Sequence, residues 1–140
     1  MKYEEQFIIM QGLPRSGKST IVREELIPQG YVRVCPDDIR LKLHGSPHNP
    51  RQEPLVWMFV EMSIELLLEQ GHKVVLDACS VDHWSRKKWF KYNPYFIVVD
   101  TSKEVCKSRT EDPGLLDAIE RMSHKWSLPE MRILETRTMV

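Results

Sequence analysis

Short apolar runs alternate along the chain with stretches of helical periodicity. The apolar runs are expected to form strands at residues 6–11, 31–35, 73–76 and 95–99. Helices are expected at 18–27, 38–44, 55–70, 82–90, 102–110 and 115–126. In the longest of these helices Leu55, Phe59, Met62 and Leu66 recur with a period near 3.6. Residues 45–54 contain a glycine and three prolines and are predicted to be a loop, while 133–140 fit either a last strand or a tail.

Strands that are separated by helices are joined by crossovers, so they lie parallel in one sheet. The apolar runs are nearly continuous, which is typical of a sheet covered by helices on both faces. The pattern therefore predicts a doubly wound α/β fold, a three-layer sandwich around a mostly parallel sheet. Ligands of such sheets bind beyond the carboxyl ends of the strands, where Asp37, Asp77 and Asp100 are all expected to lie.

A phosphate-binding loop is predicted directly after the first strand. Residues 12–20, GLPRSGKST, match the pattern G-x-x-x-x-G-K-[ST] and lie between a strand and a helix. Glycines allow the backbone amides to curl around phosphates, and the helix N-terminus adds partial positive charge. Lys18 is expected to reach the β- and γ-phosphates, and Ser19 to bind Mg²⁺. The candidate nucleotide-binding residues are Gly12, Pro14, Arg15, Ser16, Gly17, Lys18, Ser19 and Thr20.

Composition narrows the class of protein. With 140 residues, a single domain spanning 1–140 is expected, and 41% hydrophobic with 29% charged residues is ordinary for a globular chain. Twenty basic and twenty acidic residues cancel, so nothing indicates nonspecific binding to nucleic acid. Three separated cysteines without C-x-x-C spacing favour a reducing cytoplasm, and no apolar run is long enough to predict a membrane partner. The oligomeric state is not indicated.

The rest of the sequence favours a small phosphotransferase among the P-loop classes. The guanine-reading N-K-x-D of GTPases is absent, as is a long apolar stretch ending in Asp-Glu, which marks ATPases that activate water. Asp37 follows the second strand and could take the proton of an acceptor hydroxyl. Arg40 lies one turn further and could hold an acceptor phosphate. A helix-capping aspartate with an ion pair three residues on explains the spacing equally well.

The phosphate loop and the Asp37-Asp38-x-Arg40 element together resemble the kinase domain of phage polynucleotide 5′-hydroxyl kinase and the wider group of zeta-toxin-like small P-loop kinases. Residues 74–78, VVLDA, and a lid segment at 107–118 extend the resemblance. It implies a phage-encoded cytoplasmic enzyme that uses ATP and Mg²⁺. Its acceptor would be the 5′-hydroxyl of a nucleic-acid end or a nucleotide.

The same resemblance implies roles for individual residues. Lys18 would bind the nucleotide phosphates, and Ser19 and Asp77 the metal. Asp37 would be the general base, Arg40 would hold the acceptor's 3′-phosphate, and Arg109 would be the lid arginine. The chain departs from the family where Arg15 replaces a glycine and where the lid is short and acidic. A metabolite or nucleoside kinase, and a nucleotide-binding regulator or toxin-like protein with little turnover, are the alternatives.

A weaker feature is the basic and aromatic segment at 84–92. It could form a surface for a nucleic-acid strand, although a solvated helix face with tryptophans at the core edge is the favoured interpretation.

Overall fold

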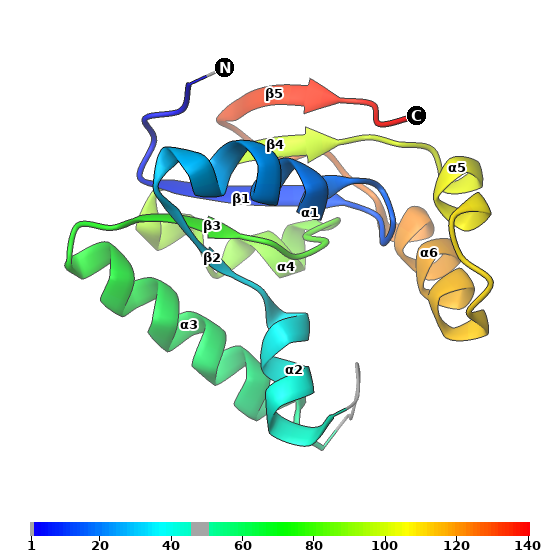
Figure 1. Ribbon diagram of the computed structural model, residues 1–140, viewed down its shortest axis with the longest axis horizontal. Helices are drawn as coiled ribbons and strands as arrows, with labels where there is room; N and C mark the ends of the chain where they lie inside the picture. The colour runs from blue at the N-terminus through cyan, green and yellow to red at the C-terminus, as the bar shows by residue number, and fades with distance from the viewer. Residues whose placement is uncertain (1, 46–50) are drawn as a thin grey trace.

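The computed structural model describes residues 2–45 and 51–140, and these contain one five-stranded sheet (Figure 1). All its strand pairs are parallel, and the strand order is β2-β3-β1-β4-β5. The fold is therefore the predicted doubly wound α/β fold. The strands are β1 (Phe7–Gly12), β2 (Tyr31–Val34), β3 (Lys73–Leu76), β4 (Tyr95–Val99) and β5 (Ile133–Arg137).

The central strand β1 is buried along its whole length because it has a parallel neighbour on each side and helices over both faces. Ile8 is aligned with Val75 of β3, and Gly12 at its carboxyl end is aligned with Val99 of β4. Alternate side chains of β1 enter two separate cores, as the two-residue period of a strand requires. Ile8 and Met10 face one core, whereas Phe7 and Ile9 face the other.

Helices follow the predicted positions closely. The first begins as α1 (Lys18–Ile21), continues through a π-helical segment (Val22–Leu26) and ends in a 3₁₀ turn (Ile27–Gln29) where proline and glycine stop it. The others are α2 (Pro36–His44), α3 (Glu53–Glu69), α4 (His83–Lys87), α5 (Lys103–Ser108) and α6 (Pro113–Lys125). A short 3₁₀ segment, Phe90–Tyr92, follows α4.

The helices make the outer layers of the sandwich. Ile21, Val22 and Leu26 pack from the α1 segment onto one face of the sheet. Val60 and Ile64 of α3 and Trp89 after α4 pack onto the other face. A third, smaller cluster lies beyond the carboxyl ends of β1 and β4, where α5 and α6 stand in Figure 1. It joins Leu13, Val81, Cys106 and Ile119, and so attaches the two helices to the start of the phosphate loop.

The structure refines the sequence predictions for three segments. The ambiguous segment 133–140 forms β5 and then a short tail. The apolar period that indicated α3 is not its buried face, since the fully buried residues of α3 are Val56, Val60 and Ile64. Periodicity identifies a helix but not which of two apolar faces meets the sheet. Of the predicted loop at 45–54, residues 46–50 lie outside the described part, and α3 begins within the rest.

Candidate active site at the phosphate loop

The phosphate loop leaves β1 at Gly12 and enters α1 at Lys18. A Cβ atom at Gly12 would lie 2.5 Å from Ser16 Oγ and 3.2 Å from the Val99 carbonyl oxygen, so only glycine fits this close turn. Gly17 has φ +105° immediately before the helix, a conformation that also favours glycine. Arg15 adopts a left-handed conformation as well, with φ 67°. The loop is thus a built cradle whose shape depends on these few backbone positions.

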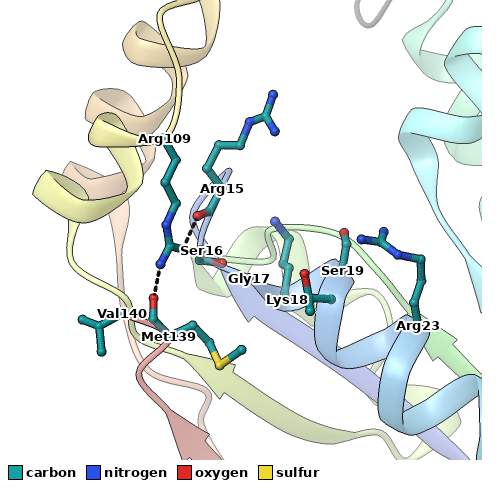
Figure 2. Close-up of a pocket in the computed structure, with 10 residues that line it drawn as sticks. Arg15, Ser16, Gly17, Lys18, Ser19, Arg23, Arg109, Met139 and Val140 are labelled. Carbon is teal, nitrogen blue, oxygen red and sulfur yellow. Dashed lines mark hydrogen bonds between the residues drawn. The ribbon is translucent and has the colours of Figure 1, made fainter.

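A cavity of about 580 Å³ opens over this cradle (Figure 2). Its lining contains four basic residues and no acidic one. Such a concentration of positive charge beside a helix N-terminus is suited to a polyphosphate. The lining consists of residues 15–20 with Arg23, Arg109, Met139 and Val140.

Lys18 is buried at the base of this site, and its Nζ donates a hydrogen bond to the Leu13 carbonyl oxygen at 3.3 Å. Burial by itself lowers the pKa of Lys18, but the neighbouring Cys79 and Asp77 outweigh burial and hold its pKa above the usual value. The charge of Asp37 acts on Lys18 in the same direction. The lysine is therefore kept as a cation at neutral pH, as a phosphate ligand must be.

Ser19 and Asp77, the two predicted metal residues, are in direct contact. Ser19 Oγ donates to Asp77 Oδ2 at 2.9 Å, and Asp77 is almost fully buried at the end of β3. Mg²⁺ is commonly held by one or two protein oxygens together with substrate phosphates and water, so this hydroxyl and carboxylate fit such an ion. Arg33 of β2 also donates to Asp77 Oδ2, at 2.8 Å, and balances its buried charge. Among the described residues, no cluster of three or more His, Cys, Asp or Glu side chains could hold a metal by itself.

Arg109 lies across the cavity from α1, at the end of α5. Its guanidinium donates to the carbonyl oxygens of Arg15, at 2.9 Å, and of Met139 (Figure 2). Thr101, just after β4, connects the same segments from below. Its hydroxyl donates to the Ser16 carbonyl oxygen at 2.8 Å and accepts the Met139 amide at 3.0 Å. The phosphate loop, Arg109 and the tail after β5 are therefore joined by hydrogen bonds into one unit.

The second predicted group, Asp37 and Arg40, lies in α2 at the carboxyl end of β2. Arg40 Nη1 donates to Asp37 Oδ1 at 2.6 Å, so the spacing does place the two side chains in contact. The other edge of the guanidinium forms a two-point pair with Glu53, at 2.9 and 2.7 Å. Burial alone lowers the pKa of Arg40, but the hydrogen bonds to Glu53 and Asp37 raise it overall. Asp37 itself is exposed.

Sequence reasoning did not find Glu53, Arg33, Thr101 or Met139. Each meets its partner in the site only through the fold, from between 13 and 85 positions away in the sequence, and no motif marks any of them. In the basic and aromatic segment Lys87, Lys88 and Lys91 are exposed, as the favoured interpretation of a solvated helix face expects, but Arg86 is not. Arg86 and Trp89 are fully buried, so neither can contact a nucleic-acid strand, whereas Trp84 is exposed.

A parallel sheet of this order, with a phosphate-binding loop between β1 and α1, defines the P-loop kinase class. Residues 7–113 match the model of the AAA_33 family, described as an AAA domain. The chain belongs to this family. In the part of the chain that the structure describes, no helix has the length and apolar character needed to cross a membrane.

Solved structures with the same fold include several kinds of kinase. A chain of the Pnkp1/Rnl/Hen1 complex is 27% identical, with a TM-score of 0.69 over 81% of this chain. This chain spans 42% of that protein, which is less than half its length. A putative kinase from Chloroflexus aurantiacus (15% identity, TM-score 0.72, covering 96% of this chain and 88% of the other) shares the fold. The Mycobacterium tuberculosis APS kinase CysC also shares the fold, with 21% identity and a TM-score of 0.61, covering 93% of this chain and 87% of the other. The kinase-type fold supports phosphotransfer from a bound nucleotide.

Proposed function

We propose that the protein is an ATP- and Mg²⁺-dependent phosphotransferase whose acceptor is the 5′-hydroxyl of a polynucleotide or nucleotide. The observation that carries this proposal is the position of Asp37. It stands in the first turn of α2, in contact with Arg40, and its charge acts on Lys18 of the phosphate loop. A carboxylate therefore lies within electrostatic reach of the phosphate loop. Similarity to a chain of an RNA repair complex supports the nucleic-acid acceptor.

On the donor side the backbone of the loop would hold the phosphates of ATP. Lys18 would neutralise charge on the β- and γ-phosphates, and Arg109 would bind charge that develops during transfer. Ser19 and Asp77 would hold Mg²⁺, which supplies charge neutralisation and alignment when it is bound. These groups position the phosphates and form no covalent bond to them.

On the acceptor side Asp37 would orient the hydroxyl and accept its proton. A new bond forms between the acceptor oxygen and the γ-phosphorus, while the bond from that phosphorus to the bridging oxygen breaks and ADP leaves with the electron pair. Arg40, held against Asp37 at 2.6 Å, would orient the carboxylate and offer its guanidinium to a phosphate on the acceptor.

The test is phosphate transfer from labelled ATP with Mg²⁺ to 5′-hydroxyl oligonucleotides, with and without a 3′-phosphate on the end nucleotide. Asp37→Asn should lower kcat by about 10²- to 10⁴-fold, the usual contribution of a general base, with ATP affinity nearly unchanged. Glu4→Gln is the control, because Glu4 is an exposed carboxylate before β1, at the other end of the sheet from the phosphate loop. Transfer by wild-type protein to none of the oligonucleotides refutes the polynucleotide acceptor, and full activity of Asp37→Asn refutes the base.

A second candidate, a kinase of small hydroxyl metabolites or nucleosides, is favoured by Glu53. Its carboxylate already occupies one edge of the Arg40 guanidinium at two points, so an acceptor phosphate would have to compete with an anion. An acceptor without a phosphate would not have to compete with Glu53 for the Arg40 guanidinium. A screen of nucleosides and sugars separates the two candidates, and nucleotide binding without transfer to any acceptor would favour a nucleotide-binding regulator.

A further inference from the structure

The outer side of α3 is an apolar surface that the described part of the chain leaves uncovered. Its residues, each between 38% and 56% exposed, are Leu55, Met58, Phe59, Met62 and Leu66, and we call them the α3 outer face. In Figure 1, α3 lies at the margin of the molecule with its inner side toward β2 and β3. Large apolar side chains gathered in this way on a soluble surface mark an interaction site.

The spacing of these residues suits a second helix. Leu55, Phe59, Met62 and Leu66 follow one another at intervals of four, three and four residues. That is the alternation of a coiled-coil seam over two heptads, about 16 Å along the helix at 1.5 Å per residue. Opposite them, Val56, Val60 and Ile64 fill the core, so α3 is apolar on both sides. The fold of a single chain explains only the buried side.

We propose that the α3 outer face binds the same face of a second copy of this chain, with the two helices antiparallel across a twofold axis. The axis would pass between Phe59 and Met62. Leu55 of one copy would then meet Leu66 of the other, and Phe59 would meet Met62. A twofold arrangement needs one self-complementary surface, which a short symmetrical seam of this kind provides.

The charges beside the seam favour the antiparallel orientation. α3 contains four glutamates and neither lysine nor arginine. Glu65 and Glu69 are exposed in its second half, whereas Arg51 is exposed just before its start. Glu69 is in the last turn, where the dipole of its own helix disfavours a negative charge. In an antiparallel pair it would lie beside Arg51 and the positive helix start of the other copy, whereas a parallel pair would bring glutamates together.

The size of the surface agrees with a weak dimer. The five side chains of the α3 outer face are each about half exposed, so their burial would remove roughly a few hundred Å² of apolar area from water. Interfaces of standard size bury about 800 Å² on each side, so a seam of this size is expected to bind weakly.

The test is the mass of the protein in solution by sedimentation equilibrium and by light scattering. We expect the average mass to rise from that of a monomer toward that of a dimer between about 1 and 100 µM, a range reached by the weaker interfaces of standard size. Met62→Lys should raise the dissociation constant by at least about 10-fold, as loss of a central contact does. Leu128→Lys, which alters an exposed apolar residue elsewhere, should leave it unchanged.

Orientation is tested by exchanging charges. Glu69→Arg should weaken the dimer, and adding Arg51→Glu to that variant should restore it. A monomer at every concentration would overturn the proposal and leave the face to a different occupant. A dimer whose dissociation constant is unchanged by Met62→Lys would also overturn the proposal. So would a double variant, Glu69→Arg with Arg51→Glu, that dimerises no better than Glu69→Arg alone. Circular dichroism on each variant verifies that the fold is retained.

Discussion

Arg86 holds a positive charge in a place that is closed to solvent. Its guanidinium donates to Gln11 Oε1 of β1, to the Ser127 and Leu128 carbonyl oxygens, and to Glu130. From the sequence, this arginine was predicted to lie on a basic, solvated helix face. Its real surroundings come from a segment about forty residues further along the chain, and no local pattern reveals such a partner.

Arg86→Met should therefore be among the most destabilising single substitutions in the chain. Its loss would leave the acceptors of Gln11 and Ser80 buried without a donor, and each buried unsatisfied group costs about 1–3 kcal/mol. Equilibrium unfolding in urea measures the loss. Arg121→Met is the control: Arg121 pairs with Asp117 on the exposed surface of α6, and such a pair is worth about 0.3–0.5 kcal/mol. Equal losses for both variants would contradict the structural role of Arg86.

Glu130, the acidic partner of Arg86, gives stability a dependence on pH. Burial raises the pKa of Glu130, but hydrogen bonds from Arg86 and His83 prevail and lower it to about 2. A pKa lowered by folding stabilises the protein fully above the unfolded value of about 4.3 and progressively less as the pH falls toward 2. Glu130→Gln should flatten the fall in unfolding free energy between about pH 4.3 and 2. Glu111→Gln, a change at an exposed acid, should leave the slope unaltered.

At the scale of elements, most of the fold was predictable. β3 and β4 begin and end at the expected residues, and the phosphate loop lies between the expected strand and helix. Prediction was weakest where tertiary contacts decide the outcome. Glu53 reaches Arg40 only because α3 packs beside α2, and the choice of buried face on α3 depends on the sheet beneath it. Residue roles at the site stay predictions, because they depend on ligands.

The start of α4 is an element boundary whose energy can be measured. Asp82 accepts the Ser85 amide at 3.0 Å while Ser85 Oγ reaches back toward the Asp82 amide, so the two form a capping box. Asp82→Ala should reduce the free energy of unfolding by about 1 kcal/mol. Asp82→Asn keeps an oxygen at the cap and should recover most of that loss. Thermal unfolding compares wild type, Asp82→Ala and Asp82→Asn. An alanine variant as stable as wild type would show that the cap does not stabilise the protein.

At the scale of the whole molecule, Thr101 joins parts that are remote in the sequence. Its hydroxyl bonds both the phosphate loop, through the Ser16 carbonyl oxygen, and the tail after β5, through the Met139 amide. Met139 also reaches Gly17, where an added Cβ would approach it to 3.0 Å. The shape of the nucleotide cavity thus depends on the last residues of the sheet as much as on the loop itself.

Thr101→Val keeps the shape of this side chain but removes its hydrogen bonds. Because buried groups would lose their partner, the free energy of unfolding should fall by about 1–3 kcal/mol, and the affinity for ATP should fall with the loosened loop. Calorimetric titration with ATP and Mg²⁺, together with urea unfolding, measures both effects. Thr136→Val, at an exposed residue of β5, is the control. Unchanged ATP affinity in Thr101→Val would show that the loop keeps its shape without this hydrogen bond.

The shared carboxylate of Asp77 has a consequence for the order of events. One oxygen receives both Ser19 and Arg33, and Arg33 in turn holds Asp38 at 2.7 Å in the helix that carries Asp37. A Mg²⁺ ion held by Asp77, as proposed above, would share this carboxylate with Arg33 and would weaken the link from Arg33 to Asp38 of α2. If α2 carries the proposed base, binding of the metal and nucleotide would change the position of that helix, so we expect the nucleotide to bind before the acceptor.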